Sequence, residues 1–251
     1  MLTKLLASIG IGSARVNLEV AGTAVPLGGI LNGTIRIQGG NVEQQVDKIY
    51  INLILSSAYK AGDQTRNIRR IIGTVTVGEK MVVRPGEEKV YPVSFQIPFG
   101  LPISRGRTRY FLQTGLDIPQ AIDPVDHDPI QIVPNREFKM FFDALRFLGF
   151  REKPGCGDYN GRFQEFEYRP TTYFARELDE IEVYPVAGER ELVVVMQLDK
   201  KARGLFGSLL DELDLDERFV RFTIPYSEID SVAGLAGMLR SIIEREYRKI
   251  I

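Results

Sequence analysis

The sequence is poor in the residue types that most often carry chemistry or cross-link a fold. Its 251 residues include one cysteine, one histidine and no tryptophan. A single cysteine, Cys156, excludes an internal disulfide framework, and with no secretory signal it indicates a cytoplasmic setting. A lone histidine, His127, leaves one base for any Ser-His or Cys-His nucleophile. The composition therefore argues against those two classes of enzyme.

Long apolar runs and a strong net charge are also missing. No segment approaches the roughly 18 apolar residues of a transmembrane helix. The apolar stretch Met1–Gly10 is shorter than that, so we expect a short helix there and no stable membrane insertion. The net charge of −1 provides no general attraction for nucleic acid.

Basic residues gather at only two places, which are the candidate partner-binding residues. The first group is Arg66, Arg69 and Arg70, and the second is Arg105, Arg107 and Arg109. Both groups are too small for a nucleic-acid stripe. A solvated β face is one interpretation, and contact with an anionic partner is the other.

Alternating apolar and polar residues dominate the first half and predict β-strands. The expected strands are Ala14–Val20, Leu31–Ile37, Val46–Tyr59, Ile68–Val77, Lys89–Pro98, Thr108–Leu116 and Ile130–Val133. We expect a polar loop over Lys60–Asn67. Hairpin-length connections favour an antiparallel sandwich.

The second half mixes helices with strands. Helical spacing predicts helices over Asn135–Leu148, Leu205–Leu213 and Ser231–Ile250, with Asn135 as an N-cap. Strands are expected over Phe163–Tyr168, Leu178–Tyr184, Glu191–Leu198 and Phe219–Ile224. We therefore expect two domains, residues 1–134 and 135–251.

The stretch Asp123–Pro134 between these halves allows two interpretations. It gathers Pro124, Asp126, His127, Asp128, Pro129 and Pro134. As a site, it resembles part of a calcium loop, but it lacks the glycine and the final glutamate. As structure, three prolines fix φ and make a stiff inter-domain connector. We favour the connector, and expect no catalytic residue, metal or cofactor.

One enzymatic alternative stays open. A pair of carboxylates in the second half would suit a β-sandwich hydrolase or a carbohydrate-binding module. Acidic pairs such as Asp179-Glu180 and Asp211-Glu212 are also common on solvated faces.

Several phrases are similar to one known family. They are Leu5–Ser13, Gly86-Glu87-Glu88, Phe95–Pro98, Ala121–Asp126, Leu148-Gly149-Phe150, Leu178–Glu182 and Leu215–Arg218. The chain resembles the bacterial stage-zero sporulation-control protein family, which has an arrestin-like fold. The resemblance implies a mainly β chain of two arrestin-like β-sandwich domains in tandem, the second decorated with helices. It also implies a cytoplasmic regulator or scaffold that has no catalytic centre and binds protein partners. A homodimer is a second expectation, which we leave open.

Overall fold

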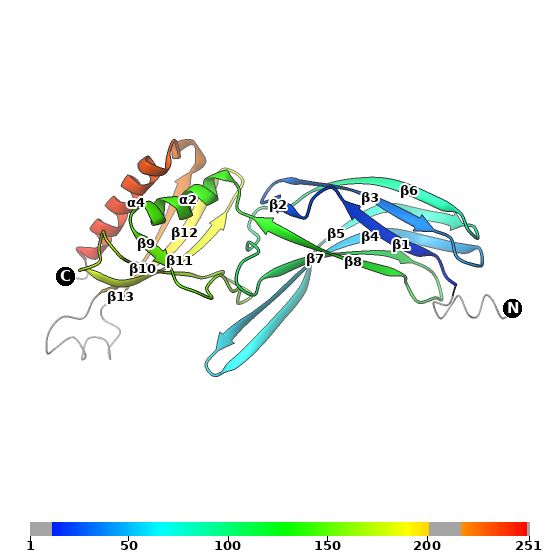
Figure 1. Ribbon diagram of the computed structural model, residues 1–251, viewed down its shortest axis with the longest axis horizontal. Coiled ribbons are helices and arrows are strands. Elements are labelled where there is room, and N and C mark those ends of the chain that lie inside the picture. Colours follow the sequence, from blue (N-terminus) through cyan, green and yellow to red (C-terminus); the bar gives the residue numbers. More distant parts are fainter. Residues whose placement is uncertain (1–11, 201–216, 250–251) are drawn as a thin grey trace. The chain divides into compact units, whose positions relative to one another are not determined.

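The computed structural model of the chain describes residues 12–200 and 217–249 (Figure 1). The chain is mainly β, as expected, and divides into two units. Unit 1 comprises Met1–Ile97 and Thr108–Val133, and unit 2 comprises Pro98–Arg107 and Pro134–Ile251. The division differs from the expected boundary at residue 134 in one segment, Pro98–Arg107, which belongs to unit 2.

Unit 1 is a sandwich of two sheets. Its strands are β1 (Arg15–Val20), β2 (Ala24–Pro26), β3 (Ile30–Gln38), β4 (Gln44–Ala61), β5 (Gln64–Val83), β6 (Glu88–Gln96), β7 (Arg109–Asp117) and β8 (Val125–Val133). One sheet has the order β1-β3-β6, and the other has the order β2-β8-β7-β4-β5. Seven of these strands confirm predictions. The eighth, β2, was not predicted because three residues are too few to show a period of two.

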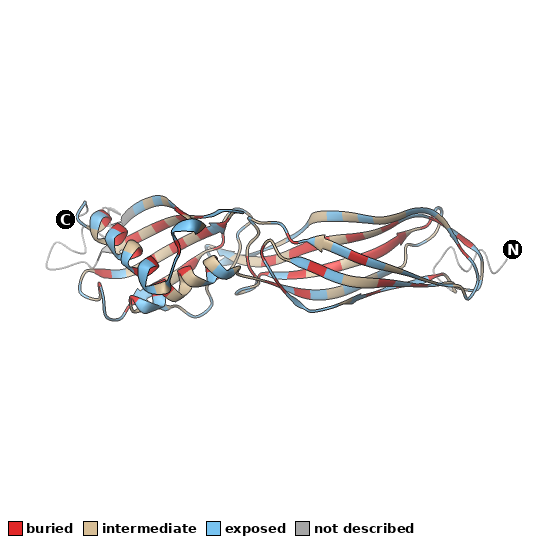
Figure 2. Cartoon of the chain, turned by 90° about the horizontal axis from the view of Figure 1, so that it is seen from above, coloured by how far each residue is buried: buried red, intermediate tan, exposed pale blue. Residues whose placement is uncertain are grey.

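The core of unit 1 follows from strict alternation along the strands. In β3, Leu31, Ile35 and Ile37 are buried, whereas Asn32 and Arg36 are exposed. Buried and more exposed residues also alternate along β1 and the first part of β7, and Figure 2 colours the chain by burial. Burying an aliphatic side chain stabilises a fold by about 1.5–3 kcal/mol, so this inward row fixes which face each strand presents.

The expected loop over Lys60–Asn67 is wrong. From Ile54 onward β4 pairs with β5 without a register shift as far as Ala61 and Gln64, leaving Gly62 and Asp63 as the turn. Gly62 has a φ of +59°, a conformation that glycine adopts at little cost. The polar residues misled the prediction because an exposed hairpin end needs no apolar alternation.

The expected connector is also shorter than predicted. Residues Val125–Val133 form β8, which pairs with β7 and β2. Pro129 fits because β2 pairs with β8 only from Gln131 onward, so the proline occupies a stretch with one neighbour. Only Pro134 and Asn135 remain between β8 and the next helix.

Unit 2 combines one described sheet with two helices. Its strands are β9 (Phe150–Glu152), β10 (Phe166–Pro170), β11 (Leu178–Ala187), β12 (Glu191–Lys200) and β13 (Glu217–Pro225), in the order β13-β12-β11-β10-β9. Helices α2 (Arg136–Phe147) and α4 (Val232–Tyr247) lie against one face of this sheet, where a sandwich would place its second sheet (Figure 1). A short 3-10 turn, η1 (Tyr226–Glu228), precedes α4.

The start of α2 confirms the predicted N-cap, and α4 is capped in the same way. Asn135 accepts a hydrogen bond from the Phe138 N–H at 3.0 Å, and Ser231 caps α4 through the Gly234 N–H. Gly149, at φ +82°, follows α2. The predicted helix over Leu205–Leu213 lies outside the described residues. Within the described chain, no helix combines the length and apolarity needed to cross a bilayer.

Candidate functional site

Asp126 connects the two sheets of unit 1. Its Oδ2 accepts a hydrogen bond from the Leu18 N–H of β1 at 2.9 Å, and its Oδ1 accepts one from the N–H of His127. The His127 side chain is exposed on the strand. The structure therefore gives Asp126 a structural contact and leaves His127 at the surface.

Asp128 is the perturbed carboxyl of this stretch. Burial, and then the neighbouring Asp126, raise the pKa of Asp128 to about 6. Its Oδ2 is buried with no hydrogen-bond partner, as is Oγ1 of Thr114, the residue opposite Asp126. In the described chain, these two atoms are the buried side-chain polar atoms without a hydrogen-bond partner. The buried part of β7 and β8 therefore contains polar atoms whose hydrogen bonding is not satisfied.

Replacing Asp128 with asparagine should stabilise unit 1 at neutral pH. Because the folded state holds the Asp128 proton more tightly than the unfolded chain, stability falls as the pH rises from the ordinary carboxyl range through about 6. Because Asp128 is partly exposed, we expect the substitution to raise the free energy of unfolding by only about 1 kcal/mol at a pH of about 8. This gain should vanish at a pH of about 4. Thermal unfolding at both pH values, with exposed Asp47→Asn as the control, measures it. An equal gain at both values would contradict this account.

Cys156 lacks the surroundings of a nucleophile. Its Sγ donates to the Lys153 carbonyl at 3.1 Å and to Oε1 of Glu152 at 3.4 Å. Burial raises the pKa of the thiol to about 11, with Glu152 acting in the same direction. A thiol activated for catalysis shows the opposite shift.

Glutamates gather on the unit 2 sheet, on the face away from the helices. The group, termed the glutamate cluster, consists of Glu165, Glu167, Glu180 and Glu182 with Lys153 and Tyr184. Lys153 Nζ binds Glu167 at 3.0 Å and also Glu180, and the Tyr184 hydroxyl donates to Glu182 at 2.5 Å. Burial, then Glu182 and Glu167, raise the pKa of Glu165 to about 7. Sequence reasoning missed this cluster, because its members come from β10, from β11 and from residues that flank β9 and β10.

Two pockets of the described chain are lined by residues other than the glutamate cluster. One cavity of about 640 Å³ lies in unit 1 between Gly12–Val16, Gln38–Asn41 and Ile122–Val125. The other, of about 360 Å³, lies in unit 2 beside Tyr173, Phe174 and Tyr247. Within the described residues no group of three or more His, Cys, Asp or Glu side chains could hold a metal ion. Neither of these two pockets surrounds the acids of the carboxylate-pair alternative.

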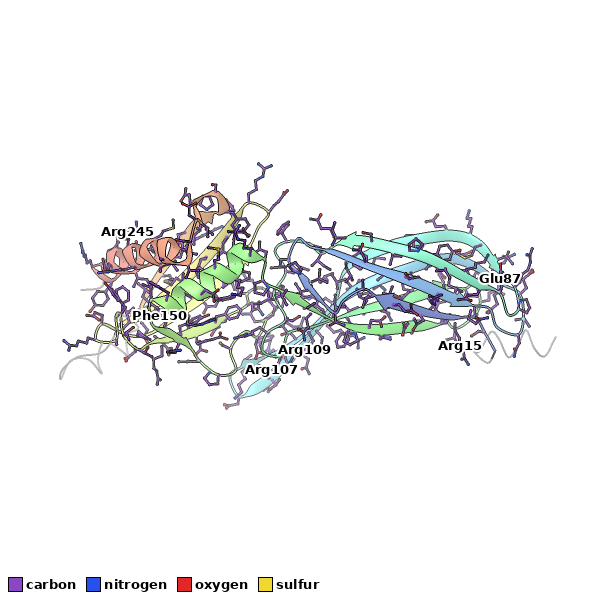
Figure 3. All side chains as sticks on the ribbon, turned by 45° about the horizontal axis from the view of Figure 1, so that its top comes forward. Arg15, Glu87, Arg107, Arg109, Phe150 and Arg245 are labelled. Carbon is purple, nitrogen blue, oxygen red and sulfur yellow. The ribbon has the colours of Figure 1, made fainter. Side chains whose placement is uncertain are left out.

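Two arginines of the second basic group, Arg105 and Arg107, form ion pairs with carboxylates of unit 2. Arg105 Nη2 donates to both carboxylate oxygens of Glu152, at 2.8 and 2.7 Å. The backbone N–H of Arg107 and its Nε donate to Asp158 at 2.7 and 2.8 Å. Figure 3 labels Arg107 together with Arg109, which begins β7 and whose Nη1 donates to the Thr108 carbonyl.

Gln164 completes the attachment of the segment Pro98–Arg107. It is 5% exposed, and its amide accepts from the Ile103 N–H and donates to the Ile103 carbonyl, both at 2.8 Å. A further bond reaches the Gly157 carbonyl at 2.7 Å. Sequence reasoning missed these contacts, because no local pattern pairs residues 61 positions apart.

The first basic group lies on the hairpin of β4 and β5. Arg66, Arg69 and Arg70 belong to β5, are exposed, and form no ion pair within the described residues. The two predicted groups therefore differ, because Arg105 and Arg107 form ion pairs within the protein and, among the described residues, the arginines of β5 do not. Partner binding by either stays a prediction.

Comparison with known proteins identifies the family. A family model described as SpoOM protein matches residues 2–202. The sporulation-control protein spo0M of Bacillus subtilis (strain 168) is 31% identical over 252 residues, covering 96% of this chain and 97% of the relative. The crystal structure of Spo0M from Bacillus subtilis superposes with a TM-score of 0.79 at 26% identity, covering 94% of this chain and all of that one. The resemblance read from the sequence is thereby confirmed, and the chain belongs to the Spo0M family of sporulation-control proteins.

Proposed function

We propose that this protein regulates entry into sporulation by binding other proteins in the cytoplasm, as a scaffold without catalysis. The observation that carries the proposal is the match to a sporulation-control protein along nearly the whole chain. A match that covers both units supports a role for the entire molecule, since neither unit is an unrelated addition.

The surroundings of the reactive groups favour binding over chemistry. The Cys156 thiol has a raised pKa, and His127 is exposed on β8. The paired arginines Arg105 and Arg107 already have carboxylate partners. What remains available is surface: the exposed hairpin of β4 and β5, with its arginines.

The hydrolase alternative rests on Glu165, whose raised pKa suits a general acid. A glycosidase also needs a cleft that holds the sugar between two carboxyls. The pockets described for this chain lie elsewhere, so we rank the alternative second. Hydrolysis of a glycoside that is lost in Glu165→Gln, with the fold retained, would reverse this ranking.

Affinity capture of the full chain from its host tests the proposal. Cells entering sporulation should yield at least one protein that is enriched in a fixed ratio to the bait. The matched control is the same tag without the chain. A capture from such cells with no specifically enriched protein would overturn the proposal.

A further inference from the structure

The outer edge of β5 is the longest open strand edge described in the chain. β5 has 20 residues and is the last strand of its sheet, with β4 as its only strand neighbour. In the described chain, no backbone hydrogen bond outside the strand ladder involves residues 64–83. An open edge presents a row of unpaired N–H and C=O groups, which are a template for another strand.

Beyond the rest of the sheet, β4 and β5 continue as a two-stranded ribbon. β7 pairs with β4 only as far as Ser56, opposite Arg109, whereas β4 and β5 pair on to Ala61 and Gln64. We term this part, residues 57–68, the hairpin arm; Figure 1 shows it in cyan, projecting past the other strands of its sheet. A two-stranded ribbon is marginally stable in water, and a third strand would stabilise it.

The edge carries one sign of charge. β5 contains four basic residues, Arg66, Arg69, Arg70 and Lys80, against one acidic residue, Glu79, which gives +3 on a chain whose net charge is −1. Arg66 and Arg70 share one face of the strand with Ile68 between them. Their partners on β4 are Tyr59 for Arg66, Ser57 for Ile68 and Leu55 for Arg70. That face therefore offers a basic–apolar–basic row beside a tyrosine.

We propose that β5 binds an extended acidic segment of a partner protein by strand addition, along the hairpin arm and the sheet edge beside it. The partner's backbone pairs with the open edge, and its acidic side chains, alternating with apolar ones, lie against Arg66, Ile68 and Arg70. This inference rests on the proposed function, for which it names the binding surface and the chemistry of the partner.

A peptide fits this surface better than the other occupants. A nucleic acid would use the arginines but has no backbone that matches alternating N–H and C=O groups. A second copy would set one basic edge against another, at +3 each, which opposes association. An acidic strand satisfies both the edge and the charge.

The test measures binding of a fluorescent peptide of about ten residues, alternating glutamate with valine or threonine, to the full-length chain. We expect saturable binding, weakened about tenfold or more by the combined change R66E/R69E/R70E and weakened by salt. The control is R15E/R36E, which reverses two exposed arginines on the other sheet of unit 1, one of them, Arg36, paired with Glu19 and Glu88. Circular dichroism confirms that each variant folds.

Proline variants test the edge separately from the charge. Adjacent residues in a strand direct their N–H groups to opposite edges, so one of Asn67→Pro and Ile68→Pro blocks the outer edge and leaves the ladder with β4 intact. The variant that retains the fold should lose peptide binding although it keeps all three arginines.

Each outcome decides between occupants. Binding that is lost in R66E/R69E/R70E and in the folded proline variant supports the proposal. Equal binding of the peptide by wild type and R66E/R69E/R70E overturns it. The proposal is also overturned if these substitutions abolish only a concentration-dependent dimer, measured by sedimentation. Tighter binding of single-stranded DNA or anionic vesicles than of the peptide overturns it as well. If the peptide fails to bind while affinity capture still recovers a partner, this inference fails and the proposed function stands.

Discussion

Phe141→Ala is expected to lower the free energy of unfolding of unit 2 by about 3–5 kcal/mol. The side chain is fully buried in α2, and its ring centroid lies 5.8 Å from that of Phe142. Phe142 in turn contacts Phe166 of β10 at 4.9 Å, so these rings join the helix to the sheet. Removing the Phe141 ring leaves a cavity that the Phe142 ring cannot fill without losing its contact with Phe166.

Phe147→Ala is the matched control, since it makes the same chemical change in the same helix. The Phe147 side chain is 67% exposed, so its loss should change stability by about 0.5 kcal/mol or less. Amide hydrogen exchange in α2 and β11 during denaturant unfolding reports on unit 2 alone. Comparable losses for Phe141 and Phe147 would contradict the packing of α2 on the sheet.

Gln164→Ala is expected to release the segment Pro98–Arg107 from unit 2, at a cost of about 2–4 kcal/mol in local stability. The substitution leaves the Ile103 N–H, the Ile103 carbonyl and the Gly157 carbonyl without their partners. An unsatisfied buried polar group costs about 1–3 kcal/mol. The salt bridges of Arg105 and Arg107 are half-exposed and offset little of this.

The readout is hydrogen exchange at the Ile103 amide, which should accelerate by about a hundredfold or more. Gln131→Ala, an exposed position in β8, is the control and should leave this amide unchanged. If Ile103 keeps its protection in Gln164→Ala, the segment is attached by other contacts and the role given to Gln164 is wrong.

The strands and helices were predictable wherever burial leaves a period in the sequence. β3 and β12 have one buried face, on which the buried side chains recur at every second position. α2 was predictable from the spacing of its phenylalanines and from Asn135 before it. A three-residue strand such as β2 leaves no such record.

The end of the hairpin arm, Lys60–Asn67, was not predictable as strand, because an exposed hairpin end needs no alternation. Residues Lys60–Asn67 are polar, and polar runs are typical of loops as well as of solvated hairpins. In the structure these exposed residues are strand up to the turn, because β4 pairs with β5 as far as Ala61 and Gln64. For the same reason Arg66 was expected in a loop and is found in β5.

The candidate site was predicted in composition but not in arrangement. Both arginine groups were visible in the sequence, but only the structure shows that Arg105 and Arg107 are paired with Glu152 and Asp158. Asp126, expected in a connector, forms a hydrogen bond to β1. Contacts between residues far apart in sequence decide such roles, and one sequence does not reveal them.

The most direct test of protein binding through β5 is quantitative affinity capture with the wild-type chain and R66E/R69E/R70E in parallel. Both baits are expressed at equal level in host cells entering sporulation, with R15E/R36E, which reverses two arginines on the other sheet of unit 1, as the control. The wild type and the control should recover the same partner, and R66E/R69E/R70E should lose most of it. Recovery of that partner in equal amount by all three would contradict binding through β5.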